Sequence, residues 1–577
     1  MCSVEGFTGK HDFTIEQFSK FNECRGPDGT TYYEDNYIKL GHSLLAISPN
    51  QTPRRQPWKM ENGNYLVWNG EIYGLNDDVF DTEWLSQTIS TKSIAALKRG
   101  VNWMGAGVIY DVKNLRLTLF RDHFGIKPLY YLYLDGDLFF SSTARPLYAV
   151  LNKYQKPIKR DGKHWQNFQA NDRHGFGRHT PIERIQRLHP GQILTYDIRT
   201  AKFLSSDTFW GSDSKNFTLH ADLNWTPTEL NKVLVDGIKQ VCHAPGIPKT
   251  ISMSGGLDST LIASIARKED DLDVQTVEYE NFKPSSETVN HSMMLEYQLA
   301  KRAAKKFKLP YYGTPYPYDN NELTKEGQFA ISIPQWDRNR WSTRYANVKA
   351  AADRGRKIYI VGDGADELMT GYNGDFDYFS RAKGRPGLTE ERIKLFADND
   401  TKWKELRNIV PYWLFGDDLI NNRLFSRLFQ HVDSFCTTVD HICGNFGMES
   451  RVPFLSQDVA KYLLKIPGTD KLHVPYDLDE KTRDMYKGHY KILIRDYMSK
   501  HIPKFIRERH TKIGFSTPWN ARDNDRNIGI AEEDFKIFKY QAETYFNFDN
   551  VDFSNEWKDN TQNDQIVEVN LSENSNG

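Results

Sequence analysis

Five residues near the start of the chain have the chemistry for nucleophilic catalysis by a thiol. Cys2 follows the initiator methionine, whose removal would place a thiol and a free α-amino group on one residue. An α-amine has an ordinary pKa of about 7.7–8.0 and can act as a general base near neutral pH. Asn69 and Gly70 follow the strand-like run NYLVW and could stabilise an oxyanion, whereas the carboxylates of Glu71 and Asp81 could bind a substrate ammonium. Taken alone, Cys2 is more readily explained as an ordinary second residue.

Two glycine-containing loops later in the chain suggest phosphate and metal chemistry. The first, Ser254–Ser259 (SGGLDS), lies between a strand-like and a helix-like run, where backbone N–H groups and a helix N-terminus favour phosphate. It lacks the GK[ST] of a Walker loop. The second, Gly362–Glu367 (GDGADE), also follows a strand-like run. Asp258 and Asp366 would then lie at the carboxyl ends of two strands and could hold Mg²⁺ against a pyrophosphate. The second loop alone is also compatible with a solvated turn.

The elements that must position these residues change character along the chain. Residues 2–205 contain short β-branched and aromatic runs separated by Gly, Asn and Asp, which predicts a layered α+β domain. Residues 206–220 are rich in Ser and Asp and are interpreted as a linker. Residues 221–545 begin with alternating strands, loops and helices, which predicts a parallel sheet with right-handed crossovers, and from Arg385 on they look mainly helical. Residues 546–577 form a polar C-terminal tail.

Composition excludes several classes of protein. The 577 residues carry 75 basic and 76 acidic side chains, a net charge of −1, so a strongly basic nucleic-acid binder is not expected. We find no membrane-spanning run and no secretory signal at the N-terminus. The 5 cysteines are few and odd in number, which argues for a reducing cytoplasm rather than a disulfide framework. Cys436, His441 and Cys443 fit no zinc spacing and are expected to pack in a core.

Nine strings spread along the chain carry more information together than any of them alone: MCS, RGPDG, GHSLLAI, NGEIY, RDHFGIKPLYY, SMSGGLDST, GDGADELMTGY, MESRVPFL and HTKIGFSTP. Through them the chain resembles the glutamine-hydrolysing asparagine synthetases, as a divergent member. The resemblance covers roughly residues 2 to 520. It implies an N-terminal nucleophile glutaminase domain of αββα type, followed by an α/β parallel-sheet ATP-pyrophosphatase domain of the adenine nucleotide alpha hydrolase type. The nine strings occur in the family's order and at about the family's spacing.

The resemblance assigns roles in the first domain. Cys2 matches the nucleophile that attacks the side-chain amide of glutamine. Asn69 and Gly70 match the oxyanion hole and also contact glutamine. Glu71 and Asp81 match the positions that bind the backbone groups of glutamine. The ammonia that is released would travel inside the protein to the second site.

In the second domain, the resemblance implies that aspartate is converted to asparagine through an acyl-adenylate, with release of AMP and pyrophosphate. Asp258 and Asp366 match the Mg²⁺ ligands, Asp363 an acid/base residue and Lys512 a lysine that steadies the phosphates. ATP, Mg²⁺, glutamine and aspartate, or another carboxylate acceptor, are therefore the expected ligands, and a homodimer is the expected assembly. The positions matched to ATP binding are Ser252, Ser254, Gly255, Gly256, Asp258, Ser259, Val361 and Gly362.

Two departures from the family pattern concern substrate binding. Leu44 stands where the family usually has an arginine that pairs with the α-carboxylate of glutamine, and Arg54 or Arg55 could replace it. Asp363 stands where the family commonly has glutamate, one methylene longer. Three readings stay open: aspartate as acceptor, another carboxylate as acceptor, and a binding or regulatory protein that has kept the fold without turnover.

Overall fold

The computed structural model describes the chain in segments, and every structural statement below concerns these. They are residues 2–47, 55–98, 100–156, 161, 178–180, 182–210, 222–278, 287–315, 341–372, 419–471 and 491–509.

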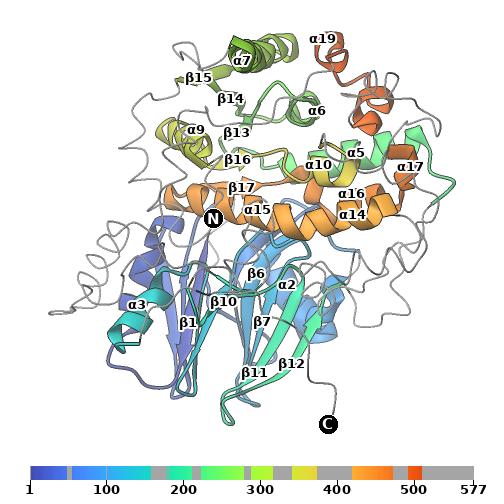
Figure 1. Cartoon of the computed structure of the whole chain (residues 1–577). Coiled ribbons are helices and arrows are strands. Elements are labelled where there is room, and N and C mark those ends of the chain that lie inside the picture. Colours follow the sequence, from blue (N-terminus) through green and yellow to red (C-terminus); the bar gives the residue numbers. More distant parts are fainter. Residues whose placement is uncertain are drawn as a thin grey trace, which may run out of the picture.

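The N-terminal domain is built from two antiparallel six-stranded sheets packed face to face (Figure 1). Valine, leucine and phenylalanine side chains from both sheets fill the space between them, as alternating strands require. In order across the first sheet, the strands are β10 (Ile185–Arg187), β8 (Tyr130–Leu134), β9 (Asp137–Ser141), β1 (Ser3–Thr8), β3 (Ile38–Ser43) and β2 (Thr30–Glu34). In the second sheet they are β12 (Lys202–Thr208), β11 (Gln192–Asp197), β7 (Arg116–Arg121), β6 (Trp103–Asp111), β5 (Tyr65–Ile72) and β4 (Trp58–Lys59).

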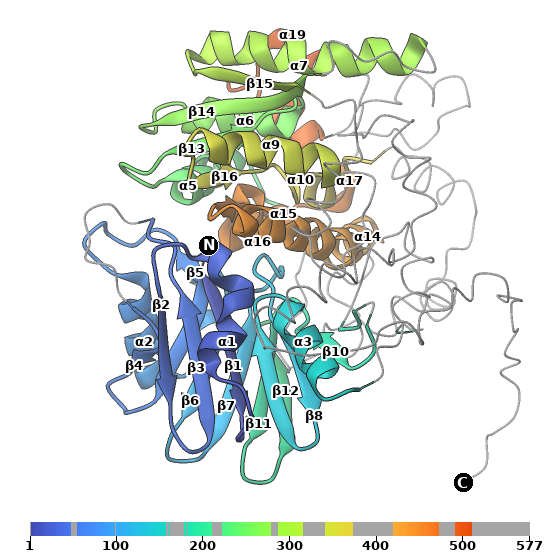
Figure 2. The ribbon, with the colours of Figure 1, turned by 90° about the vertical axis from the view of Figure 1, so that its left-hand side faces the viewer.

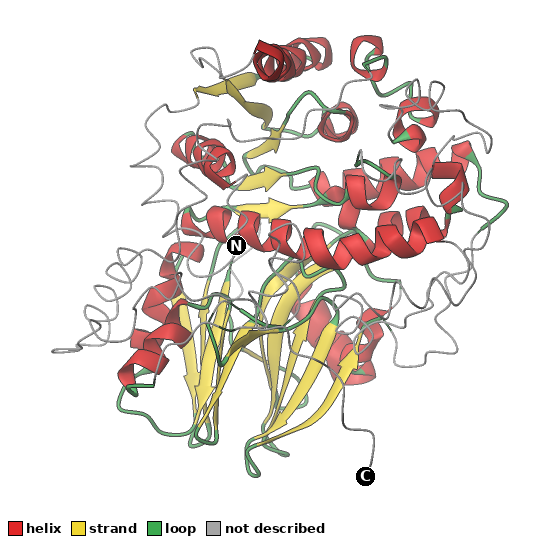
Figure 3. Cartoon of the chain, viewed as in Figure 1, coloured by secondary structure: helices red, strands yellow, loops and turns green. Residues whose placement is uncertain are grey.

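Helices cover the outer faces of both sheets, so the αββα layering expected from the resemblance is confirmed (Figure 3). Helices α1 (Ile15–Ser19) and α3 (Arg145–Lys153) pack on the first sheet, and α2 (Asp81–Lys92) packs on the second. One difference concerns the segment interpreted as a linker. Its first three residues, 206–208, belong to β12, and Phe209 and Trp210 are buried.

The C-terminal domain has a parallel five-stranded sheet, as expected. Strand β13 pairs with β14 on one side and with β16 on the other, and α6 and α9 lie on opposite faces (Figure 1). The carboxyl end of β13 is therefore a topological switch point, where α/β folds place their ligands. The strand order is β15 (Tyr311–Pro315), β14 (Leu272–Glu278), β13 (Lys249–Ser252), β16 (Ile358–Ile360) and β17 (Glu449–Arg451).

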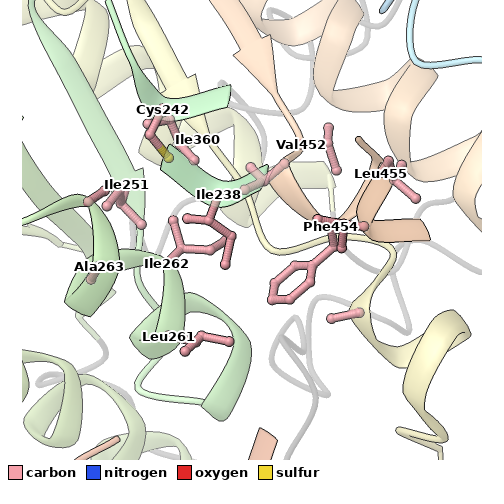
Figure 4. Close-up of a cluster of buried hydrophobic side chains, with 14 of the residues drawn as sticks. Ile238, Cys242, Ile251, Leu261, Ile262, Ala263, Ile360, Val452, Phe454 and Leu455 are labelled. Atoms are coloured by element: carbon pink, nitrogen blue, oxygen red, sulfur yellow. The ribbon is translucent and has the colours of Figure 1, made fainter. Parts of the chain in front are cut away.

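A continuous apolar core holds this sheet to its helices. Figure 4 shows Ile238 and Ile262 meeting Phe454 beside Ile251 of β13. The described helices of the domain are α5 (Pro227–Cys242), α6 (Leu257–Ala266), α7 (Glu287–Phe307), α9 (Trp341–Asp353), α10 (Ala365–Met369), α14 (Leu419–Arg427), α15 (Asp433–Asn445), α16 (Gln457–Lys465), α17 (Gly468–Lys471) and α19 (Lys504–Arg507). Within the described segments, no helix is long and apolar enough to cross a membrane.

Helix α15 lies between the two domains and joins them through buried ion pairs (Figure 2). Asp433 lies 2.8 Å from a guanidinium nitrogen of both Arg121 and Arg187. About two helical turns further along α15, Asp440 lies 2.7 Å from Arg25 Nη2. All of these side chains are at most 3% exposed, so each charge depends on its partner. The RGPDG and RDHFGIKPLYY strings thus supply cations that fix the second domain on the first.

Candidate active sites

The first site lies at the end of the N-terminal domain that faces α15 and α16, where the chain starts (Figure 2). Cys2 immediately precedes β1, and its Sγ accepts a hydrogen bond from Leu45 N at 3.5 Å. Arg25, which pairs with Asp440, also donates through Nε to Cys2 O at 3.3 Å. Burial raises the pKa of the Cys2 thiol, so the thiol needs a base to become a nucleophile.

Strand β5 carries the proposed oxyanion stabilisers. Asn69 is 1% exposed, and its Nδ2 has no hydrogen-bond partner among the described residues. A buried amide donor without a partner destabilises the folded protein, so such a donor is typical of a site where a substrate supplies the missing acceptor. Gly70 is required by packing, because a Cβ there would lie 2.3 Å from Trp68 Cζ3 and 2.4 Å from Met104 O.

Two carboxylates border this region. Glu71 ends the NGE string on β5, and burial raises its pKa, while Arg451 opposes that rise from an ion pair at 3.4 Å. Asp81 begins α2, and burial raises its pKa to about 6, against hydrogen bonds from Thr82. An ammonium group placed between them would lower both pKa values, so the pair is suited to bind a cationic substrate group.

The C-terminal domain completes the surroundings of this site. Arg451 lies at the end of β17, and its Nε donates to Glu449 Oε1 at 2.8 Å. Burial acts against the ionised form of Glu449, but Arg451 and Lys127 hold the pKa of that carboxyl below its ordinary value. Sequence reasoning missed Arg451 and Glu449 as parts of the first site, because they are more than 370 residues from Glu71 along the chain. The MESRVPFL string was the only available signal.

Leu44 stands where an arginine is expected, and the structure places another arginine, Arg55, near it. Leu44 N donates to Gly29 O at 2.9 Å, and a Cβ on Gly29 would lie 3.5 Å from Arg55 Nη1. The guanidinium of Arg55 is therefore adjacent to the turn that holds Leu44. Arg54 lies outside the described residues.

The second site lies at the switch point of the parallel sheet. Strand β13 ends at Ser252, and Gly256 precedes α6 without a side-chain cap, so the first N–H groups of α6 are left for a ligand. Ser254 Oγ accepts from Gly256 N at 3.3 Å, and Ser259 Oγ accepts from Ser254 N at 3.2 Å. These two bonds, from backbone N–H groups to serine hydroxyls within the same loop, hold the loop in a compact conformation.

Glycines make the close approaches in this site possible. Gly255 has φ +75°, and a Cβ there would lie 2.5 Å from Glu296 O on α7. A Cβ on Gly362 would lie 3.2 Å from Asp258 Cβ, so the two loops pack against each other. Val361, between β16 and Gly362, donates its N–H to Arg451 O at 3.0 Å, which connects this loop to the strand that borders the first site.

The two expected metal ligands converge on one cation. Asp258 in α6 and Asp366 in α10 both form ion pairs with Lys491, the latter at 2.6 Å. Although burial alone would lower it, the two carboxylates raise the pKa of Lys491. Because both carboxylates already surround one positive charge, their arrangement fits a bound Mg²⁺. Sequence reasoning missed Lys491, which no local pattern marks.

Asp363 has a partner that the sequence did not reveal. Its two carboxylate oxygens accept hydrogen bonds from Arg344 on α9 at 2.8 Å and 2.7 Å, the bidentate geometry of a strong ion pair. Its role in proton transfer stays a prediction. Lys512 lies outside the described residues, as does the 546–577 tail. No group of three or more potential metal ligands occurs in the described segments, and His441 instead contacts Tyr130 OH at 3.1 Å.

Comparison with known proteins decides the family. The model of the asparagine synthase family matches residues 231–552, and a glutamine amidotransferase domain model matches residues 1–210. The chain belongs to the asparagine synthase family. This membership agrees with the two-domain architecture and with the arrangement of the motifs at two sites.

Relatives across the family are similar at modest identity. Asparagine synthetase [glutamine-hydrolyzing] 1 of Bacillus subtilis is 26% identical over 65% of this chain and 59% of its own length. A probable asparagine synthetase of Acanthamoeba polyphaga mimivirus is 25% identical over 90% of this chain and 86% of its own. A putative asparagine synthetase of Methanocaldococcus jannaschii is 23% identical over 89% and 92%. The second and third of these relatives match this chain over most of its length and of their own.

Proposed function

We propose that this chain is an ATP-dependent, glutamine-hydrolysing amidotransferase that converts aspartate into asparagine and releases AMP and pyrophosphate. The observation that carries the proposal is the buried Nδ2 of Asn69, which has no hydrogen-bond partner among the described residues. It lies in the domain that contains Cys2, which is joined to a domain with a phosphate-type loop. Family membership supports the pairing of these two chemistries.

In the first site, the thiolate of Cys2 attacks the side-chain amide carbon of glutamine. The Asn69 amide and the Gly70 N–H stabilise the oxyanion that forms. Ammonia leaves, and water hydrolyses the resulting thioester to glutamate and free Cys2. Glu71 and Asp81 bind the α-ammonium of glutamine, and Arg55 is a candidate for its α-carboxylate, in place of the arginine that is missing at Leu44.

In the second site, an oxygen of the acceptor carboxylate attacks the α-phosphorus of ATP, and pyrophosphate leaves. Ammonia then attacks the acyl carbon, and AMP leaves. Backbone N–H groups of the Ser254–Ser259 loop would bind the phosphates, Asp258 and Asp366 would hold Mg²⁺, and Lys512 would contact the phosphates. Mg²⁺ supplies charge compensation for the leaving pyrophosphate.

A different acceptor is the second candidate, and one contact favours it. Both oxygens of Asp363 are engaged by Arg344, so the acceptor side of the switch point contains a fixed ion pair where the family commonly has a longer carboxylate. The shorter carboxylate, held back by Arg344, would leave more room beside it than a glutamate does, which would suit an acceptor larger than aspartate. A homodimer and a cytoplasmic location also stay predictions.

The test is pyrophosphate release from ATP with glutamine and Mg²⁺, with and without aspartate, while asparagine is followed in parallel. Aspartate-dependent pyrophosphate with matching asparagine is the expected result. Cys2→Ala should abolish glutamine-dependent turnover but retain ammonia-dependent turnover. Release with another carboxylate instead would select the second candidate, and no release with any carboxylate would leave a binding or regulatory protein.

A further inference from the structure

Lys491 occupies the point at which the two expected metal ligands meet. Its Nζ lies 2.6 Å from Asp366 Oδ1, and it also contacts Asp258 Oδ2. The lysine side chain is 3% exposed, whereas the carboxylates are 19% and 25% exposed. The ammonium is thus covered by protein, whereas both acidic side chains are partly exposed to solvent.

The position of Lys491 is set by its surroundings and not by local sequence. Its φ of +55° lies in the left-handed region, which non-glycine residues rarely adopt. Gly371 leaves the room for its stem, because a Cβ on Gly371 would lie 2.7 Å from Lys491 Cε. A backbone held in an unfavourable region beside a glycine that clears space for the side chain is typical of a functional site.

A metal ion and this ammonium cannot share the two carboxylates. Mg²⁺ needs its oxygen ligands at about 2.0–2.1 Å, and the Lys491 Nζ already fills the gap between them. Two carboxylates and one ammonium sum to a charge of −1. Mg²⁺ arriving alone would displace the ammonium from both carboxylates that neutralise it, whereas Mg²⁺ arriving with a polyphosphate brings an anion that can receive it.

We propose that Lys491 is the resting counter-ion of this metal site: it fills the site in the nucleotide-free protein and yields it only when the metal arrives with a polyphosphate. The role in turnover rests on the proposed function, but the exchange itself is a binding property. Binding measurements therefore separate the two, because a failure to make asparagine would leave the metal affinities unchanged.

The experiment is calorimetric titration of the full chain with Mg²⁺ alone and with Mg²⁺ in the presence of pyrophosphate. The wild-type protein should bind Mg²⁺ alone at least tenfold more weakly than Lys491→Met does, and pyrophosphate should strengthen Mg²⁺ binding more in the wild type than in that variant. Equal affinities of the two proteins for Mg²⁺ alone would overturn the proposal.

Lys249→Met is the matched control. Lys249 is also fully buried and pairs with Asp270 at 3.1 Å, but it lies at the opposite end of β13. This variant should bind Mg²⁺ alone as weakly as the wild type does. A gain in Lys249→Met equal to that of Lys491→Met would show a general effect of removing a buried cation, which contradicts the proposal.

Two further measurements keep the test decisive if Lys491→Met folds poorly. Lys491→Arg retains the charge and should still bind Mg²⁺ alone weakly, so tight binding by this variant would count against the proposal. In the wild type, pyrophosphate should strengthen Mg²⁺ binding at least tenfold beyond the affinity of Mg²⁺ for pyrophosphate in solution. Absence of that enhancement would refute the exchange without any variant.

Discussion

Arg451 Nη2 lies 3.4 Å from Glu71 Oε1, and this ion pair joins the last strand of the parallel sheet to the candidate glutamine site. The same arginine donates to the carbonyl oxygens of Val241 and His243 at 3.1 Å and 2.9 Å. Its guanidinium is therefore fixed by the C-terminal domain while its charge acts on the N-terminal one. The ionisation of Glu71 thus depends on how the two domains meet.

Changing Arg451 should shift the pH dependence of glutamine use. Burial raises the pKa of Glu71 and Arg451 counteracts it, so Arg451→Met should raise that pKa further. If ionised Glu71 binds the substrate ammonium, the acid limb of kcat/KM for glutamine moves to higher pH by about one unit. Arg451→Lys should give a smaller shift, and Arg356→Met, which removes an arginine paired with Asp271, none. An unchanged acid limb in both Arg451 variants would contradict the role.

Removing the amide of Asn69 should slow glutamine hydrolysis specifically. Loss of one oxyanion donor costs about 10²–10³-fold in kcat, so Asn69→Ala should show that loss with intact ammonia-dependent turnover. The control is Asn22→Ala, because Asn22 is equally buried but already bonded to Ser141 and Thr143. It should lower the unfolding temperature more than kcat. A similar kcat loss in both variants would point to a structural effect.

The neighbouring glycines of the phosphate-type loop should differ in tolerance. Gly255→Ala forces a side chain into φ +75° and against Glu296 O, whereas Gly256→Ala meets only Ser254 Oγ, at 3.2 Å. Gly255→Ala should abolish the thermal stabilisation by MgATP, and Gly256→Ala should retain most of it. An equal loss of the thermal stabilisation by MgATP in both variants would mean that the left-handed backbone at Gly255 is not needed for phosphate binding.

Neutralising Asp433 should destabilise the domain interface strongly. Asp433→Asn leaves Arg121 and Arg187 buried without their carboxylate, which costs about 3–5 kcal/mol of unfolding free energy. Asp353→Asn breaks an exposed pair with Lys349 and should cost no more than about 0.5 kcal/mol. Chemical denaturation of both variants measures the difference. A loss below about 1 kcal/mol for Asp433→Asn would show that water reaches the arginines.

Glu5 should make stability depend on pH. Burial raises its pKa from 4.5 to about 8, so between these values the folded chain holds a proton that the unfolded chain has lost. The protonated Glu5 therefore leaves the free energy of unfolding undiminished below pH 4.5, and this free energy falls as pH rises from 4.5 toward 8. Glu5→Gln removes this loss and should gain, relative to wild type, on the order of 4 kcal/mol between pH 4.5 and 8.5. Denaturation at both pH values, with the exposed Glu34→Gln as control, checks it; equal gains would contradict the prediction.

Local patterns were sufficient for the layers and for the two loops. Strand-and-turn periodicity predicted a layered α+β domain, whereas the two-sheet sandwich was expected only from the family resemblance. The strand–loop–helix order predicted the parallel sheet and the position of Asp258. They failed at residues 206–208, where Ser and Asp suggested a linker but pairing with β11 makes a strand. Strand formation there is decided by the neighbouring strand and not by intrinsic propensity.

The partners of the site residues could not be predicted in the same way. Lys491 and Asp258 are 233 positions apart, and Arg344 and Asp363 lie on elements whose contact depends on how α9 packs. No periodicity along the chain encodes such pairs. The sequence therefore predicted Asp363 as an acid/base carboxylate, whereas its bidentate ion pair with Arg344 is visible only in the structure.

The buried acidic face of α15 limits how this protein can be re-engineered. The helix belongs in sequence to the C-terminal half, yet its charges are balanced by Arg25, Arg121 and Arg187 from the N-terminal half. Consider a chimera in which the N-terminal half is exchanged for that of another protein. Asp433 and Asp440 would remain buried at the domain interface without a counter-charge, unless the incoming half carries cations at the same positions. Hybrid designs should therefore move α15 together with the N-terminal half, even though the two are distant along the chain.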